Sequence, residues 1–226
     1  MTQTLSDPAA APAPRRRGRP TKSQGEVEST RTLIVRSAAE EFGRGGFDAT
    51  SMRAIAREAG VDPALVRHYF SDKAQLFSEA IAAPMRPDQL VRHALDGSPE
   101  EMGANLVRYI VSTLDEPGVS DRIVRMMHTA MTQEFAADLF REFLMRAVLT
   151  PIAQSVSEHD VDQRASFAAA QVIGLVMARY ATPIEPMASA TTDEVVAQIG
   201  PVLQWLLLGG SLHPADSTLI FASTEE

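Results

Sequence analysis

The chain has 226 residues, 45 % of them hydrophobic, so it is long and apolar enough to bury a sizeable core. It contains no cysteine, which excludes disulfide frameworks, thiolate nucleophiles and cysteine-ligated zinc. The net charge of −8 is unevenly spread: residues 1–82 hold 12 Lys and Arg against 10 Asp and Glu, and residues 83–226 hold 9 against 19. This asymmetry separates a near-neutral to basic head from an acidic body, with chance composition as the alternative.

The first 27 residues show no hydrophobic period and are rich in Ala, Pro, Thr, Ser and Gln, which predicts a disordered arm. No apolar core follows its basic residues, so we expect no secretory signal. No stretch of the chain reaches the roughly 20 apolar residues that a membrane span needs. We therefore expect a cytoplasmic protein without a membrane partner.

Helical periodicity begins after the arm, with one apolar stripe over about residues 29–44. The pair Gly45-Gly46 is expected to stop this helix. Thr50 or Ser51 then caps a second, amphipathic helix, which Gly60 ends.

A third, short helix follows, because Asp62 is a good N-cap and Pro63 is tolerated in a first turn. Val66 and Phe70 are expected to point inward. Two short helices joined by a glycine turn match the helix-turn-helix pattern, whose second helix must be exposed on one face to enter a major groove about 12 Å wide. An ordinary helical hairpin is the alternative. The outward side chains are Pro63, Ala64, Arg67 and His68, with Leu65 and Tyr69 at the edges.

Ser71 or Asp72 is expected to cap a fourth helix, ended by Pro84 and Pro87. We find no β alternation and no internal repeat, so the predicted fold class is all-α. Further helices are expected over residues 89–95, 99–115, 120–132, 134–156, 161–181 and 192–208.

Residues 31–77 resemble the DNA-binding domain of the tetracycline-repressor (TetR/AcrR) family, and the stretches RAVLTPIAQ and QVIGLVMARY are similar to one C-terminal subgroup of that family. The resemblance implies a TetR-type three-helix helix-turn-helix domain over 28–88, with the motif at about 50–70. It implies a helical effector-binding and dimerisation domain over 89–212, followed by a tail over 213–226. The shared residues are Ala39, Phe42, Gly46-Phe47, Thr50-Ser51, Ile55-Ala56, Ala59-Gly60-Val61, Tyr69-Phe70 and Lys73.

The resemblance implies that the partner is double-stranded DNA with a palindromic operator. It places Ser51 and Arg53 near the DNA backbone and Tyr69 and Lys73 on phosphates. The chain departs from many members at Ala64, where they have Gly, and at Arg67, where they have Tyr. Arg67 therefore either contacts a phosphate or reads a base edge. The residues placed in the groove are Pro63, Ala64, Leu65, Arg67 and His68.

The arm holds the sequence Arg15-Arg16-Arg17-Gly18-Arg19-Pro20, in which Arg17 and Arg19 resemble the core of a minor-groove AT-hook. Arginines are drawn to the negative potential of a narrow A·T groove. A solubilising basic tail is the alternative.

A flexible, polarizable zone of Met and Phe side chains favours a pocket for a small apolar or amphipathic effector, with plain core as the alternative. Two tyrosines would add polar tips. The candidate pocket residues are Tyr109, Met126, Met127, Met131, Phe135, Phe143 and Tyr180.

The helices expected over 161–181 and 192–208 carry wide apolar faces. The family resemblance implies that they pair with their copies in a four-helix homodimer interface. The candidate interface residues are Phe167, Gln171, Leu175, Ile199, Leu203 and Leu206.

Our first hypothesis is a ligand-responsive transcriptional repressor that a small molecule releases from its operator, with the helix over 72–83 as the lever. The second is a DNA-binding regulator controlled by a protein partner, and the third is a helical enzyme or scaffold with a coincidental hairpin. No phosphate-binding loop, dinucleotide fingerprint or nucleophile elbow occurs, so we expect no enzyme, no cofactor and no metal. None of the histidines pairs with another at metal-ligand spacing: His68, His93, His128, His159 and His213.

Overall fold

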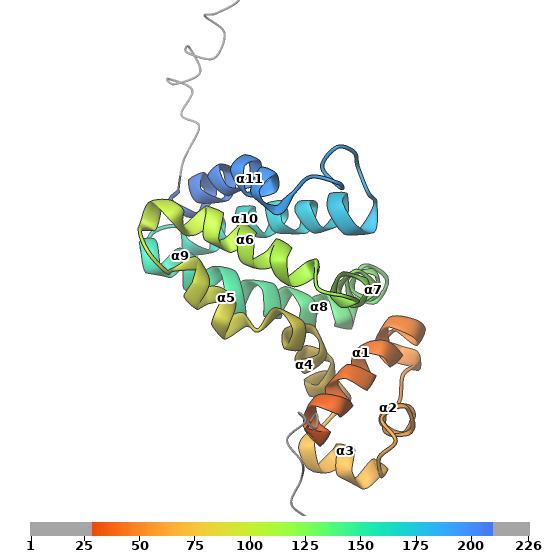
Figure 1. Cartoon of the computed structure of the whole chain (residues 1–226). Helices are drawn as coiled ribbons and strands as arrows, with labels where there is room; N and C mark the ends of the chain where they lie inside the picture. The colour runs from red at the N-terminus through yellow and green to blue at the C-terminus, as the bar shows by residue number, and fades with distance from the viewer. Residues whose placement is uncertain (1–28, 210–226) are drawn as a thin grey trace, which may run out of the picture.

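A computed structural model describes residues 29–209 of the chain (Figure 1). Every regular element within this range is helical and none is a strand, which confirms the predicted all-α fold class. The predicted arm, with Arg17 and Arg19, and the predicted tail lie outside the described residues.

Four helices make up the N-terminal part: α1 (Thr30–Ala49), α2 (Met52–Glu58), α3 (Pro63–Tyr69) and α4 (Lys73–Met85). Two helix ends differ from expectation. Gly46 does not stop α1 but kinks it, with a φ of 76° that glycine adopts without steric cost, and the helix resumes to Ala49. Pro84 lies inside the last turn of α4, where its missing N–H removes one hydrogen bond without breaking the helix.

Side-chain caps set where these helices begin. Ser51 rather than Thr50 caps α2, because its Oγ accepts the N–H of Ala54. Thr50 is buried instead, and its hydroxyl donates to the Gly46 carbonyl at 2.7 Å. The predicted cap Asp62 accepts the Ala64 N–H, and Asp72 rather than Ser71 caps α4.

The rest of the described chain forms a layered helical body. Its elements are α5 (Pro87–Ala94), η1 (Pro99–Glu101), α6 (Met102–Leu114), α7 (Val119–Thr132), α8 (Glu134–Glu142), η2 (Phe143–Leu149), α9 (Thr150–Val156), α10 (Val161–Val176), η3 (Met177–Ala181) and α11 (Thr192–Leu207). The segments η2 and η3 are π-helical turns within longer helical runs. Such turns are rare and concentrate at functional sites.

The buried apolar side chains fall into two clusters. One joins α1 to α4 around the rings of Phe42, Phe47 and Phe77, and it also takes in Met126 from α7 and Ala136 from α8. The other is formed mainly by buried side chains of the elements that run from α5 to α11. Figure 1 shows α1, α2 and α3 together at one end of the molecule, with α4 leading from them into the body.

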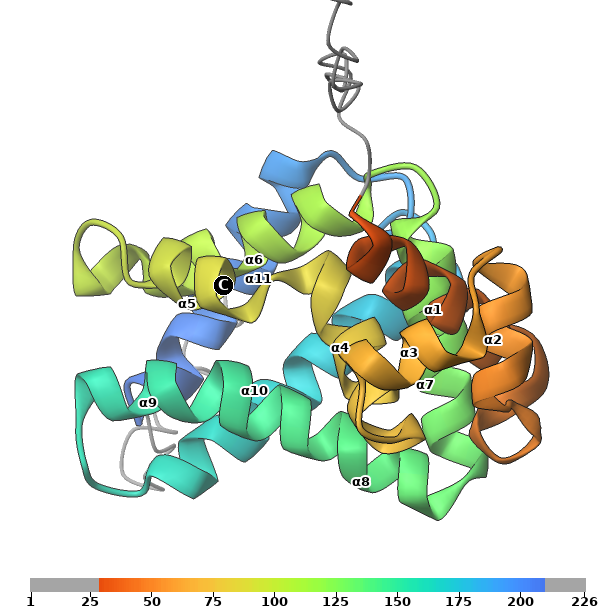
Figure 2. The ribbon, with the colours of Figure 1, turned by 90° about the horizontal axis from the view of Figure 1, so that it is seen from below.

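Seen from below (Figure 2), α1 and α3 lie to the right of α4, α8 lies below it and α10 to its left. Contacts of α4 with α1, α6, α7, α8 and η2 agree with this placement. A shift of α4 therefore has to be accommodated by both clusters.

Candidate nucleic-acid interface and ligand cavity

Helix α3 is anchored by its inner face. Val66 and Phe70 are 0 % and 1 % exposed, and they pack on α1, α2 and α4 within the first cluster. Phe70 also lies under the guanidinium of Arg31, which is 5.2 Å from the ring centroid. Arg31 in turn binds Glu79 of α4 at 2.7 Å, so it ties the end of α3 to two other helices. Sequence reasoning missed this contact, because it joins residues 48 positions apart.

The outer face of α3 is open to solvent. Pro63, Ala64, Arg67 and His68 are exposed, and Leu65 is half-buried at the edge. Tyr69 is 38 % exposed, with its ring edge against His68. The structure thus brings the predicted reading residues together on one convex surface. Their side chains offer a guanidinium, an imidazole and small apolar groups, which suit base edges and thymine methyls.

The residues predicted to contact the DNA backbone fall into two groups. Ser51 and Arg53 lie at the start of α2, where Arg53 is exposed. Lys73 differs from expectation: its ammonium donates to the carbonyl oxygens of Phe47 and Thr50 at 2.8 and 3.1 Å and to that of Asp48 at 3.4 Å. It also lies 4.3 Å from the centroid of the Phe47 ring. Its three protons are used inside the protein in this structure, which favours a structural role for Lys73 beside the predicted phosphate contact.

The last turn of α1 is also bound to the body. The side-chain oxygen of Gln133, between α7 and α8, accepts the N–H groups of Phe47 at 2.7 Å and Asp48 at 3.2 Å. Lys73 and Gln133 together hold this turn through its carbonyls and its amides. No local signal predicted the Gln133 contact, which spans 86 positions.

A Met-lined cavity of about 450 Å³ opens between α7, α8, η2 and α10. A smaller void of about 50 Å³ lies behind it and has Ile81 and Met85 of α4 in its wall. The two spaces are adjacent because four residues line both, Met127, Phe140, Leu144 and Ile173. Together they form an apolar path from the surface of the body to α4.

The predicted pocket residues are only partly brought together. Met127, Met131 and Phe143 line these apolar spaces. Met126 is 1 % exposed and belongs to the cluster around α1 to α4, and Phe135 packs on Phe47 with ring centroids 4.9 Å apart.

The two tyrosines also lie elsewhere. Tyr109 lines a separate cavity beside α1 and α4. The Tyr180 hydroxyl donates to Asp115 at 2.9 Å. Burial and this hydrogen bond raise the pKa of Tyr180 to about 12.

Helices α10 and α11 are rotated about their axes relative to the prediction of the interface. Leu175 and Leu203 are 1 % and 0 % exposed within one protomer, so they belong to its core. Phe167 is 55 % exposed as expected, and Val202 and Trp205 present 40 % and 41 % of their surface on α11. The half-buried residues of the predicted set are Gln171, Ile199 and Leu206.

Residues 29–209 offer neither a membrane-spanning helix nor a cluster of metal ligands. No helix in this range is both long and apolar enough to cross a membrane. No three His, Asp or Glu side chains in the same range gather as a metal site would require.

Two family models match the chain. Residues 34–80 match the model of bacterial regulatory proteins of the tetR family, and residues 100–207 match the tetracyclin repressor-like C-terminal domain. A crystal structure of a TetR-family regulator from Streptomyces coelicolor is 33 % identical, with a TM-score of 0.60 over 83 % of this chain and 99 % of that one. The chain belongs to the TetR family.

Two further proteins are similar to this chain. The HTH-type transcriptional regulator UidR of Escherichia coli K12 is 26 % identical over 145 residues, which cover 57 % of this chain and 73 % of UidR. Salmonella enterica GusR shares the fold at 20 % identity, with a TM-score of 0.56 over 83 % of this chain and 97 % of GusR. The protein is therefore a DNA-binding transcriptional regulator of the TetR family.

Proposed function

We propose that this TetR-family regulator is a repressor that a small apolar or amphipathic effector releases from a palindromic operator. The observation that carries the proposal is the Met-lined cavity together with the smaller void behind it, which has Ile81 and Met85 of α4 in its wall. The same helix packs on α1 of the DNA-reading end. A ligand in the cavity therefore acts on the element that joins the two parts.

We assign DNA reading to the outer face of α3 in a unit spanning 28–88, and effector binding and dimerisation to 89–212. In a dimer, two copies of α3 would enter successive major grooves about one helical turn apart. Arg67 and His68 have the reach and the donors for base edges or phosphates, and Ala64 is small enough to meet a thymine methyl.

Effector binding alters DNA affinity only if the ligand prefers one of two conformations. Methionine side chains suit a ligand whose shape varies, because they are unbranched and polarizable. Filling the cavity would press on α4 and change the placement of α3. Couplings of this kind typically amount to about 1–3 kcal/mol, or about 5–150-fold in affinity.

DNA binding is tested by fluorescence anisotropy with the DNA that flanks the gene, at several salt concentrations. Arg67→Ala with His68→Ala should abolish sequence-specific binding while the protein stays folded. Arg92→Ala with His93→Ala removes the same two residue types from an exposed face of α5 and should bind as the wild type does. Retained specificity in the first variant would remove α3 from the reading role.

Effector binding is tested by a thermal-shift screen of apolar and amphipathic small molecules, followed by DNA binding in the presence of each hit. Ala137→Phe places a ring in the Met-lined cavity and should bind DNA but no longer respond. Gln154→Phe adds the same ring at an exposed site on α9 and should respond as the wild type does. Hits that leave DNA binding unchanged would favour control by a protein partner instead.

A further inference from the structure

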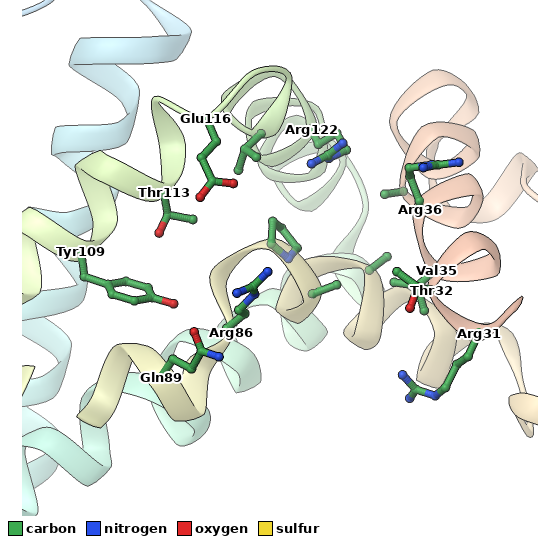
Figure 3. A pocket seen from close by; sticks show the side chains of 15 residues that line it. Arg31, Thr32, Val35, Arg36, Arg86, Gln89, Tyr109, Thr113, Glu116 and Arg122 are labelled. Atoms are coloured by element: carbon green, nitrogen blue, oxygen red, sulfur yellow. The ribbon is translucent and has the colours of Figure 1, made fainter. Parts of the chain in front are cut away.

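A second cavity, of about 410 Å³, lies between the DNA-reading end and the body (Figure 3). Its wall comes from α1, α4, the start of α5, α6 and the start of α7. It shares no lining residue with the Met-lined cavity or with the smaller void behind it. Helix α4 presents Ala83 and Pro84 to this space, and Ile81 and Met85 to that void. Helix α4 is thus bordered by two distinct cavities, and the proposed function uses only one of them.

The wall of this junction cavity is strongly basic. Four arginines line it, and Glu116 is its one acidic lining residue. Arg31 is occupied by Glu79 at 2.7 Å. The side chains of Arg86 and Arg122 have no ion pair or hydrogen bond to any residue in the described range 29–209. Two guanidinium groups therefore border the cavity without an ion-pair partner among residues 29–209.

The backbone holds Arg86 at this place. Arg86 is the corner between α4 and α5, with a φ of 41° and its N–H donating to the Ala82 carbonyl at 2.8 Å. This left-handed conformation is unfavourable for a non-glycine residue, so the surrounding structure has to hold it. Pro87 begins α5 directly afterwards, which fixes the direction of the corner.

The opposite wall offers two hydroxyl groups and the carboxylate of Glu116. Figure 3 shows Tyr109, Thr113 and Glu116 on the α6 side, facing Arg86 and Gln89 at the corner. Burial raises the pKa of Tyr109, and the charge of Arg86 opposes that rise, as expected for a guanidinium close to the phenol. Tyr109 therefore remains a neutral hydrogen-bond donor beside Arg86.

The remaining lining is apolar, formed by Val35 and Ala39 of α1, Ala80 and Ala83 of α4, and Val119 of α7. The volume falls in the range of about 300–1,000 Å³ that is usual for small-molecule sites. Unpaired guanidinium groups and hydroxyls beside an apolar wall suit a molecule with a carboxylate at one end and a hydrocarbon body.

We propose that the junction cavity binds a small organic carboxylate, with its charged end on Arg86 and Arg122 and its apolar body against Val35 and Ala80. Such a ligand touches α1 on one side and α6 and α7 on the other. It would hold the DNA-reading end in one position relative to the body. A ligand at this site would thus act on α4 from a second side, whether or not the Met-lined cavity is filled.

The test is isothermal titration of the full-length protein with 4-phenylbutyrate and with its neutral analogue 4-phenylbutan-1-ol. The wild type should bind the carboxylate in the millimolar range or tighter, and the alcohol at least about tenfold more weakly, because a charge-assisted contact is lost. Absence of carboxylate binding at millimolar concentration, or equal affinity for the two compounds, would overturn the proposal.

Paired variants locate the site. Arg86→Gln with Arg122→Gln should weaken carboxylate binding at least about tenfold. Arg92→Gln with Arg146→Gln removes the same charge from exposed ion pairs on α5 and η2 and should leave the affinity unchanged. Full affinity in the Arg86 and Arg122 variant would overturn the assignment.

Steric variants give an answer that does not depend on charge. Ala83→Phe fills the junction cavity and should abolish carboxylate binding, with folding checked by circular dichroism. Ala137→Phe fills the Met-lined cavity and should leave carboxylate binding unchanged. Loss of binding in Ala137→Phe but not in Ala83→Phe would overturn this inference and leave the proposed function standing.

Discussion

At the scale of single residues, the Lys73 ammonium is held by hydrogen bonds within the protein. It donates to the carbonyls of Phe47 and Asp48 in the last turn of α1 and to that of Thr50, and it lies over the Phe47 ring. Charge-assisted hydrogen bonds of this kind order a loop that would otherwise expose unpaired carbonyl groups. The orientation of α2, and through it of α3, therefore depends on Lys73.

Lys73→Met should lower the free energy of unfolding by about 1–3 kcal/mol, because three backbone carbonyls lose a charged donor. The slope of log affinity against log salt should stay as in the wild type. Arg53→Met, at an exposed site on α2, should instead keep stability and reduce that slope by about one. Denaturant unfolding measures the stability of each variant, and salt-dependent anisotropy measures its salt slope. A reduced salt slope with full stability in Lys73→Met would return Lys73 to the phosphate contacts.

Tyr180 predicts how stability depends on alkaline pH. Burial and the hydrogen bond to Asp115 raise its pKa in the folded protein from 10.0 to about 12. Between these values the unfolded chain has lost the phenol proton and the folded chain has kept it, so rising pH favours unfolding. The melting temperature should fall from pH 10 to pH 12, and the fall should be smaller in Tyr180→Phe. Tyr69→Phe, on the exposed end of α3, serves as the control and should follow the wild type.

At the scale of elements, α6 and α11 pack backbone to backbone. The Gly103 N–H donates to the Gln204 side chain at 2.7 Å, and a Cβ on Gly103 would lie 2.3 Å from the Gly200 carbonyl oxygen. Only glycine permits this approach. The crossing sets the position of α11, which carries the exposed Val202 and Trp205.

Gly103→Ala should therefore force α11 away from α6 and destabilise the protein by about 1–3 kcal/mol. Ser112→Ala, on the exposed face of α6, should change stability by less than about 0.5 kcal/mol. Thermal unfolding followed by circular dichroism compares them. Equal stability of the two variants would mean that the helices separate without cost.

At the scale of the whole molecule, one protomer leaves an apolar face uncovered on α10 and α11. Phe167, Val202 and Trp205 are 55 %, 40 % and 41 % exposed. Exposed apolar patches of this kind mark interaction surfaces. Pairing of this face with its copy would place two α3 helices on one DNA molecule.

Val202→Glu with Trp205→Glu should give a folded monomer that has lost most of its specific DNA affinity, because the interface would bury unpaired charge. Leu203→Glu, one position along, should unfold the protomer instead, since Leu203 is 0 % exposed. Met131→Glu alters an apolar side chain that is 62 % exposed on α7 and should remain dimeric. Light scattering at micromolar concentration measures the oligomeric state of each variant. A monomeric wild type would refute this interface.

The helices and the exposed face of α3 were predictable from the sequence alone. The caps Asp62 and Asp72, the glycine turn at Gly60 and the inward Val66 act within a few positions along the chain. Capping bonds and helical periodicity are local, so residue order is enough to set them.

Only the tertiary structure decided which distant groups meet. Gln133 reaches Phe47 across 86 positions, and Met126 packs with α1 to α4 rather than in a ligand pocket. The rotation of α11 buries Leu203 and exposes Val202, a difference of one residue that periodicity does not resolve. Cavities are what remains where packed helices fail to fill space. Their place depends on the sum of many weak, long-range contacts, each of which carries too little energy to leave a sequence signal of its own.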